Sequence, residues 1–139
     1  MSRYLLDTNA AADTIFRRRG LPERVKAARA AGHDIGIGIP VLGELYGGVE
    51  FSTSRDFNLD VFRRTVKVFR LWPFTPEAAE VYGRLYAELR RKGRIIQQVD
   101  LQIAAIALSL GRCTVVSEDS DFDAVAGLKV ENWAIRKLD

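Results

Sequence analysis

The alternation of short apolar segments with helical patterns restricts the fold of this chain more than any other feature. Five short segments are expected to form strands: 3–6, 35–39, 71–74, 114–116 and, as an edge strand, 128–130. Stretches with helical spacing of apolar residues separate the first four of them. Strands that alternate with helices form a mostly parallel sheet, with right-handed crossovers that place helices on both faces. At 139 residues, we expect one α/β domain over residues 1–139.

Proline and glycine residues indicate where the helices begin and end. The first helix is expected over residues 10–19, ahead of Gly20. Pro40 and Pro76 each suit the first turn of a helix, and Gly93 suits the position after the helix that Pro76 starts. A further core-facing helical pattern has residues three and four positions apart: Phe62, Thr65, Val66 and Phe69.

The helix expected after Pro76 has two tyrosines on its apolar face. The members of that face share helical spacing: Tyr82, Leu85, Tyr86 and Leu89. We expect the tyrosines to pack in the core rather than to form a platform on which nucleic-acid bases stack.

The composition excludes several classes of protein. With 47% hydrophobic and 28% charged residues, the chain resembles an ordinary globular protein and not a disordered one. No apolar run reaches the length of a membrane span, and the first residues lack the apolar core of a signal peptide, so we expect a cytoplasmic protein without a membrane association. One cysteine and one histidine exclude an internal disulfide and a zinc site of Cys and His ligands.

The positive charges are concentrated in three regions although the net charge is only +3. They are Arg17, Arg18 and Arg19, then Arg63 and Arg64, then Arg84, Arg90, Arg91, Lys92 and Arg94. Such clusters favour a polyanionic partner such as nucleic acid. The alternative is structural, because residues 17–19 and 90–92 are both expected in the last turn of a helix, where cations complement the helix dipole.

Four acidic residues fall beside the ends of expected strands or near the starts of helices: Asp7, Glu44, Asp100 and Asp119. In an open parallel sheet, the loops and helix starts beyond the carboxyl ends of the strands converge on one crevice. Carboxylates that share a crevice raise one another's pKa, and they stay ionised only if a cation neutralises them. Carboxylates with water are the ligands that Mg²⁺ or Mn²⁺ prefers. The residues therefore predict a metal-dependent hydrolase of phosphodiesters.

Other interpretations of these acids stay open. Asp7 and Asp100 also suit simple helix capping. A receiver-type phosphoacceptor would use an acidic, Mg²⁺-binding sheet end, and a non-catalytic nucleic-acid-binding module would use the same basic clusters. A calcium loop from Asp119 is excluded, because it would need glycine at the position of Ala124 and glutamate at that of Val130. A phosphotransferase of the haloacid dehalogenase type is disfavoured, because Asp7 lacks the second aspartate of its signature.

Four motifs, in this order and at this spacing, resemble those of a PIN-domain ribonuclease, and of the VapC toxin branch in particular. They are Leu6-Asp7-Thr8-Asn9, the segment 40–48 around Glu44, Asp100-Leu101-Gln102-Ile103-Ala104-Ala105, and the segment 116–122 with Ser117 and Asp119. The closing segment 127–133 is also typical of that branch, so the similarity spans the whole chain.

The resemblance implies a five-stranded parallel sheet of order 3-2-1-4-5, with helices on both faces. It also implies Mg²⁺ or Mn²⁺ at the acidic cleft, hydrolysis of RNA by metal-activated water, homodimerisation, and inhibition by a VapB-type antitoxin. Asp7 and Asp100 would be the principal ligands, and Glu44 and Asp119 would complete the set directly or through water. The secondary candidates are Thr8, Asn9, Ser117, which stands where the family usually has threonine, and Asp121, the alternative fourth acid.

Overall fold

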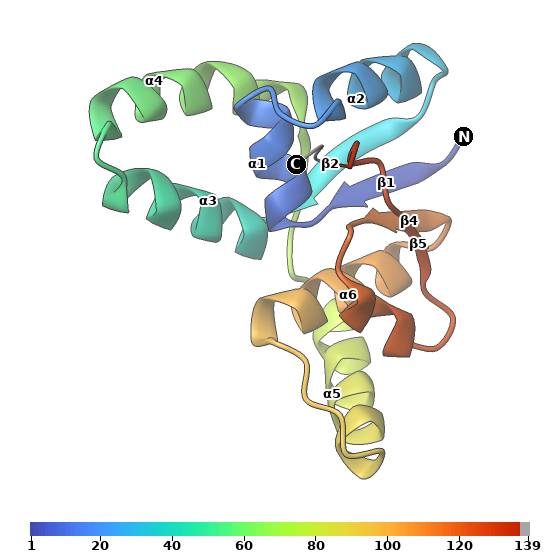
Figure 1. Cartoon of the computed structure of the whole chain (residues 1–139). Helices are drawn as coiled ribbons and strands as arrows, with labels where there is room; N and C mark the ends of the chain where they lie inside the picture. Colours follow the sequence, from blue (N-terminus) through green and yellow to red (C-terminus); the bar gives the residue numbers. More distant parts are fainter. Residues whose placement is uncertain (137–139) are drawn as a thin grey trace.

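A five-stranded parallel sheet forms the centre of the computed structural model, which describes residues 1–136 (Figure 1). The strands are β1 (Arg3–Leu6), β2 (Asp34–Gly38), β3 (Arg70–Trp72), β4 (Cys113–Val116) and β5 (Lys129–Glu131). Their order in the sheet is β3-β2-β1-β4-β5, and all four neighbouring pairs are parallel. The expected α/β fold and the expected strand order are therefore confirmed.

Six α-helices and two short 3₁₀-helices surround the sheet in residues 1–136. They are α1 (Thr8–Ile15), α2 (Leu21–Ala30), α3 (Ile39–Phe51), α4 (Arg55–Thr65), η1 (Val66–Val68), α5 (Pro76–Arg91), α6 (Gln98–Leu110) and η2 (Ser120–Ala124). Figure 1 shows α1 and α2 on one side of the sheet and α5 and α6 on the other, while α3 and α4 run as an antiparallel pair beside α1. No helix within this part of the chain combines the length and apolar character that a membrane-spanning segment needs.

The central strands are buried on both faces, which explains why they are apolar without alternation. Leu5 and Leu6 of β1 and Val115 and Val116 of β4 are at most 1% exposed. The middle of α6, residues 103–107, packs over them and is equally buried. Because β1 and β4 are adjacent at the centre of the sheet, the residues that follow them meet at its carboxyl-end edge.

The first helix is shorter than the sequence predicted. It ends at Ile15 with Phe16 as its C-cap, so the prediction that Arg17 to Arg19 occupy its last turn is wrong. Arg17 and Arg19 instead have positive φ angles of 58° and 55° in a turn. This turn delivers the chain to Gly20, where an added Cβ would lie 2.4 Å from Cδ1 of Ile135.

Several other boundaries also differ from the predictions. Ile39 begins α3 instead of ending β2. The helix that contains Phe62 ends at Thr65, and a 3₁₀ turn then leads to Phe69, whose backbone is extended. Strand β3 starts one residue earlier than expected and stops at Trp72. Phe62, Phe69 and Trp72 are nevertheless buried in the core, whereas Ile39 at the start of α3 is 44% exposed.

Candidate functional site

Four elements bring the predicted acidic residues to one open pocket at the carboxyl-end edge of the sheet. Asp7 follows β1, Asp119 follows β4, Glu44 lies in the second turn of α3, and Asp100 lies in the first turn of α6. The pocket has a volume of about 310 Å³, and its lining residues are Asp7, Thr8, Asn9, Glu44, Gln97, Asp100 and Asp119. We call it the acidic pocket.

Asp7 is the most deeply buried of the four acids, with 5% of its surface exposed. Its Oδ1 accepts a 2.8 Å hydrogen bond from the backbone N–H of Ala10, so Asp7 caps α1, as the helix-capping interpretation of the sequence predicted. Its Oδ2 accepts a 2.5 Å hydrogen bond from Oγ of Ser117. Burial raises the pKa of Asp7 above its ordinary value although both hydrogen bonds oppose the rise. Capping therefore does not account for the whole environment of this carboxyl group.

Asp100 shows most directly that the acids face a common space. Burial, followed by the negative charges of Asp119, Asp7 and Glu44, raises the pKa of Asp100 to about 6. None of the ion pairs within residues 1–136 involves any of the four acids of the acidic pocket. Their mutual repulsion is thus relieved by no side-chain cation in the described part of the chain.

Thr8 holds the carboxylate of Glu44. Oγ1 of Thr8 donates a 2.5 Å hydrogen bond to Oε1 of Glu44, which joins the first residue of α1 to α3. Glu44 is half-buried, because Val41 and Leu45 on the same helix turn into the core while Glu44 lies at its margin. Thr8, a secondary candidate from the sequence, therefore positions one acid of the pocket.

The structure separates the two candidates for the fourth acid. Asp119 lines the acidic pocket, caps η2 and accepts a 2.9 Å hydrogen bond from the N–H of Asp121. Asp121 does not line that pocket, and its carboxylate lies 3.6 Å from a guanidinium nitrogen of Arg94. The hydroxyl of Ser117 accepts the N–H of Asp119 at 2.9 Å and so connects this acid to Asp7. The geometry therefore favours Asp119.

Two further polar residues line the acidic pocket. Asn9 is exposed at the start of α1, where the sequence had placed it as a secondary candidate. Gln97 precedes α6 as its N-cap residue, and the sequence analysis missed it. Nothing in the pattern of its neighbours marks this glutamine, because it follows the apolar pair Ile95 and Ile96 and belongs to no motif.

The donor set suits a hard divalent cation in its chemistry. The acidic pocket offers carboxylate, hydroxyl and amide oxygens, with neither cysteine nor histidine among its lining residues. Within residues 1–136, no three acidic, histidine or cysteine side chains already have the spacing that one bound ion requires. The chemistry of the donor set fits a hard divalent cation, whereas the positions of the side chains do not form a ready-made site.

Comparisons with known proteins identify one family along nearly the whole length of the chain. The family model described as PIN domain matches residues 4–128. The chain is 33% identical over 133 residues to "Ribonuclease VapC2" of Haemophilus influenzae, covering 96% of this chain and 99% of the relative. It is 31% identical over 135 residues to "tRNA(fMet)-specific endonuclease VapC" of Shigella flexneri, covering 96% of this chain and 100% of that protein.

Two solved structures with a chain of the same fold are VapBC complexes. VapBC2 from Rickettsia felis, bound to a DNA fragment from its promoter, has a chain that matches with a TM-score of 0.87 and 28% identity, covering 94% of this chain and 98% of the other. DNA-bound VapBC from Salmonella typhimurium has one with a TM-score of 0.87 and 29% identity, covering 96% and 100% of the two chains.

Proposed function

This chain belongs to the PIN-domain family, and we propose that it is a VapC-type endoribonuclease, the toxin of a toxin-antitoxin pair, with residues 1–139 as its nuclease domain. The observation that carries the proposal is the acidic pocket. Four carboxylates line it at the carboxyl-end edge of the sheet, and no cation of residues 1–136 is paired with them. Relatives that match nearly their whole length are named ribonuclease or endonuclease.

We assign the four acids to a site for Mg²⁺ or Mn²⁺. Asp7 and Asp100 would hold the cation, and Glu44 and Asp119 would complete the site directly or through water. The support is electrostatic, since burial and the neighbouring carboxylates raise the pKa of Asp100, and a bound cation would offset that repulsion. The supports of Asp7 and Glu44, namely Ser117 and Thr8, limit how these carboxylates orient.

The chemistry that fits this site is hydrolysis of an RNA phosphodiester by water. When bound, the cation would lower the pKa of a water molecule, orient the scissile phosphate and offset charge on the leaving oxygen. The hydroxyl of Thr8 already donates to Glu44, and that of Ser117 donates to Asp7, so neither is poised as a nucleophile. The carboxylates orient the groups around the phosphate, and Asn9 and Gln97 offer neutral hydrogen bonds at the rim of the pocket.

The partners follow from the same assignment. The solved relatives are VapBC complexes, and we propose that this chain likewise binds a VapB-type antitoxin, forms a homodimer and acts on RNA in the cytoplasm. The basic residues Arg90, Arg91, Lys92 and Arg94 are exposed, and their positive charges complement the phosphates of such a substrate.

The test is cleavage of a structured RNA by the purified chain with Mg²⁺ or Mn²⁺ and with EDTA. We expect cleavage only with the cation. Asp100→Asn should reduce the rate by at least about 100-fold, because it removes a carboxylate from the cation site. Asp123→Asn is the matched control, since Asp123 is an exposed acid of the nearby η2 that does not line the acidic pocket, and it should cleave like the parent. Equal cleavage in EDTA, or by Asp100→Asn, would contradict the proposal.

A further inference from the structure

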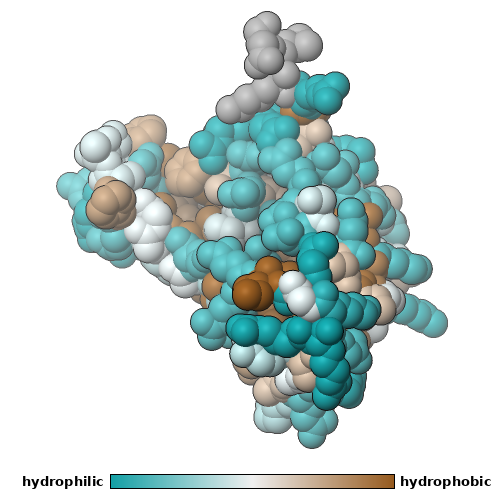
Figure 2. Space-filling model, turned by 60° about the horizontal axis from the view of Figure 1, so that its bottom comes forward, coloured by the Kyte–Doolittle hydropathy of each residue, from teal (hydrophilic) through white to brown (hydrophobic). Residues whose placement is uncertain are grey.

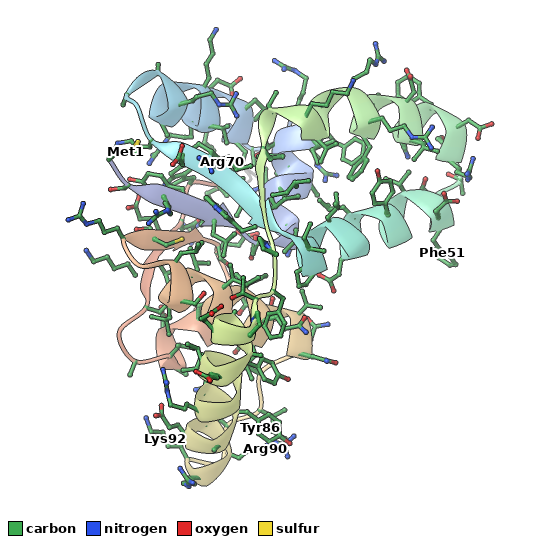
Figure 3. All side chains as sticks on the ribbon, turned by 180° about the vertical axis from the view of Figure 1, so that it is seen from behind. Met1, Phe51, Arg70, Tyr86, Arg90 and Lys92 are labelled. Atoms are coloured by element: carbon green, nitrogen blue, oxygen red, sulfur yellow. The ribbon has the colours of Figure 1, made fainter. Side chains whose placement is uncertain are left out.

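Helix α5 carries two aromatic rings and a guanidinium group on one side, from its middle to its C-terminal turn. Tyr82, Tyr86 and Arg90 follow one another at intervals of four residues, so they lie on the same side of the helix. The two tyrosine rings are stacked, with their centroids 6.3 Å apart and their planes at 24°. The guanidinium carbon of Arg90 lies 4.8 Å from the centroid of the Tyr86 ring. Figure 3 shows Tyr86 and Arg90 on the same side of α5, with Lys92 on the other.

The outer ring of this stack is not a core residue. Tyr82 is half-buried and packs against the core, with Phe74 in edge contact, as the sequence predicted. Tyr86, in contrast, is 44% exposed, so the prediction that it packs in the core is wrong. An inner tyrosine is thus fixed by packing, and it supports an outer tyrosine whose ring reaches the surface.

A pocket of about 340 Å³ opens beside this stack, which we call the α5 pocket. Its lining includes Tyr82, Tyr86, Arg90, Arg94, Gln97 and Leu101. The exposed surface on the side to which α5 extends is mainly hydrophilic around a small hydrophobic patch (Figure 2). Ile95, which also lines the α5 pocket, is 73% exposed. The pocket therefore combines an aromatic surface, an apolar contact and two cations.

The α5 pocket and the acidic pocket share a wall at the start of α6. Gln97 lines both pockets, Asp100 lines the acidic pocket, and Leu101 lines the α5 pocket. Arg94 lines the α5 pocket alone, and its guanidinium lies 3.6 Å from the carboxylate of Asp121 of η2. A flexible polyanion held at the acidic pocket would therefore reach the α5 pocket by continuing past Gln97.

The charges of the two pockets are opposite. Asp7 and Asp100 on one side suit a cation and the phosphate that it binds, whereas Arg90 and Arg94 on the other side suit the flanking phosphates directly. None of the ion pairs within residues 1–136 involves Arg90, and its guanidinium lies over the Tyr86 ring. A guanidinium stacked on an aromatic ring keeps its N–H groups available to a phosphate.

We propose that the α5 pocket binds a base and the adjoining phosphates of a single-stranded RNA segment beside the scissile phosphate. This proposal rests on the proposed nuclease function, to which it adds a substrate-binding subsite. Tyr86 is the stacking surface, and Arg90 and Arg94 contact the backbone. Stacking on an aromatic ring accepts any base but needs one that is free of its own stack, so the subsite selects single-stranded regions and rejects duplex.

The binding test uses a single-stranded RNA oligonucleotide that contains a fluorescent adenine analogue, titrated with the full chain in EDTA so that no cleavage occurs. The parent should quench the fluorescence on binding. Tyr86→Ala should bind roughly tenfold more weakly and lose the quenching, because it removes one base-stacking ring. Tyr86→Phe keeps the ring and should have the affinity and the quenching of the parent. Phe57→Ala is the control for loss of an exposed aromatic ring, since Phe57 is 68% exposed on α4 and lines neither pocket, and it should behave like the parent.

The cleavage test uses the same variants with Mg²⁺. Tyr86→Ala should raise KM and leave kcat nearly unchanged, because the subsite binds substrate away from the reacting atoms. If the parent cleaves RNA and Tyr86→Ala has the affinity and KM of the parent, the subsite is overturned while the nuclease function stands. If the parent binds the oligonucleotide through Tyr86 but never cleaves it, the nuclease function fails while the subsite stands.

The rival occupant of this surface is a second copy of the chain. Sedimentation analysis of the parent, Tyr86→Ala and Tyr86→Phe distinguishes it. A change of oligomeric state in Tyr86→Ala alone would show that the α5 pocket is an interface between copies, and it would overturn the proposal. If Tyr86→Ala fails to fold, Arg90→Ala replaces it, because Arg90 is an exposed residue in the last turn of α5, and the same loss of affinity is expected.

Discussion

Ser117 and Asp7 are joined by a hydrogen bond of 2.5 Å although they lie 110 positions apart in the sequence. They follow adjacent strands, because Val116 of β4 is paired with Leu6 of β1. The same Oγ of Ser117 accepts the N–H of Asp119 at 2.9 Å. One hydroxyl group thus connects two of the acids that we assign to the cation site.

We expect Ser117→Ala to lower both stability and cation affinity. Loss of a hydrogen bond to a buried carboxylate should cost about 1.5–3 kcal/mol of unfolding free energy. It should also raise the pKa of Asp7 further, since this hydrogen bond now opposes the rise that burial causes. Mn²⁺ affinity should fall roughly 10- to 100-fold. Urea unfolding and calorimetric Mn²⁺ titration measure the two effects, and Ser117→Thr, which keeps the hydroxyl, is the control. Parent-like Mn²⁺ affinity in Ser117→Ala would contradict this role.

Asp119→Asn and Asp121→Asn should differ in activity. Asp119 lines the acidic pocket, whereas Asp121 lies 3.6 Å from Arg94 at the surface. We expect Asp119→Asn to slow single-turnover cleavage by more than about tenfold. Asp121→Asn should stay within about threefold of the parent, because an exposed ion pair contributes little. The opposite ranking of the two variants would make Asp121 the fourth acid.

The metal-free protein should lose stability as pH rises because of Asp100. The pKa of Asp100 in the fold is raised from 3.8 to about 6, so between these values the folded state holds more protons than the unfolded state. Stability from this group is therefore present below about pH 4, declines up to about pH 6 and is absent above. In EDTA at neutral pH, Asp100→Asn should melt roughly 3 °C above the parent, because it carries no charge there.

Calorimetric scans at acidic and neutral pH check this prediction. The difference between Asp100→Asn and the parent should vanish near pH 4, where the parent carboxyl is mostly protonated. Added Mn²⁺ should raise the melting temperature of the parent more than that of the variant, because only the parent keeps the full set of carboxylates. A variant that melts below the parent in EDTA at neutral pH would show that ionised Asp100 stabilises the fold.

The sheet was predictable because its central strands are recognisable from their own residues. Leu5, Leu6, Val115 and Val116 read as continuous apolar runs, since both faces of a central parallel strand are covered. The end of α1 was not predictable, because contacts with distant residues determine it. Arg19 pairs with Glu118 at 2.6 Å and its carbonyl accepts the N–H of Ile135, and neither partner is visible from the sequence around Arg19.

The acidic pocket was predictable for a similar reason, because strand ends converge whatever the intervening chain does. The position of Asp7 after β1 and that of Asp119 after β4 follow from the strand pattern alone. The α5 pocket was not predictable. Helical spacing places Tyr82 and Tyr86 on one face, but it does not say how far the core extends along that face, and the core covers Tyr82 while leaving Tyr86 exposed.

RNA affinity should depend on salt, and Arg90 should account for a defined part of that dependence. Each phosphate contact made to a single strand contributes about −0.7 to the slope of log affinity against log salt concentration. Arg90→Ala should therefore make the slope shallower by about 0.7, whereas a variant that only disturbs folding would lower affinity equally at every salt concentration. Lys26→Ala is the matched charge control, since Lys26 is exposed on α2 and lines neither pocket. Fluorescence titrations in EDTA at several salt concentrations give the slopes. An unchanged slope in Arg90→Ala would show that Arg90 contacts no phosphate. An arginine that neutralises a phosphate releases counterions from the RNA on binding, so its deletion must reduce that release and make the slope shallower.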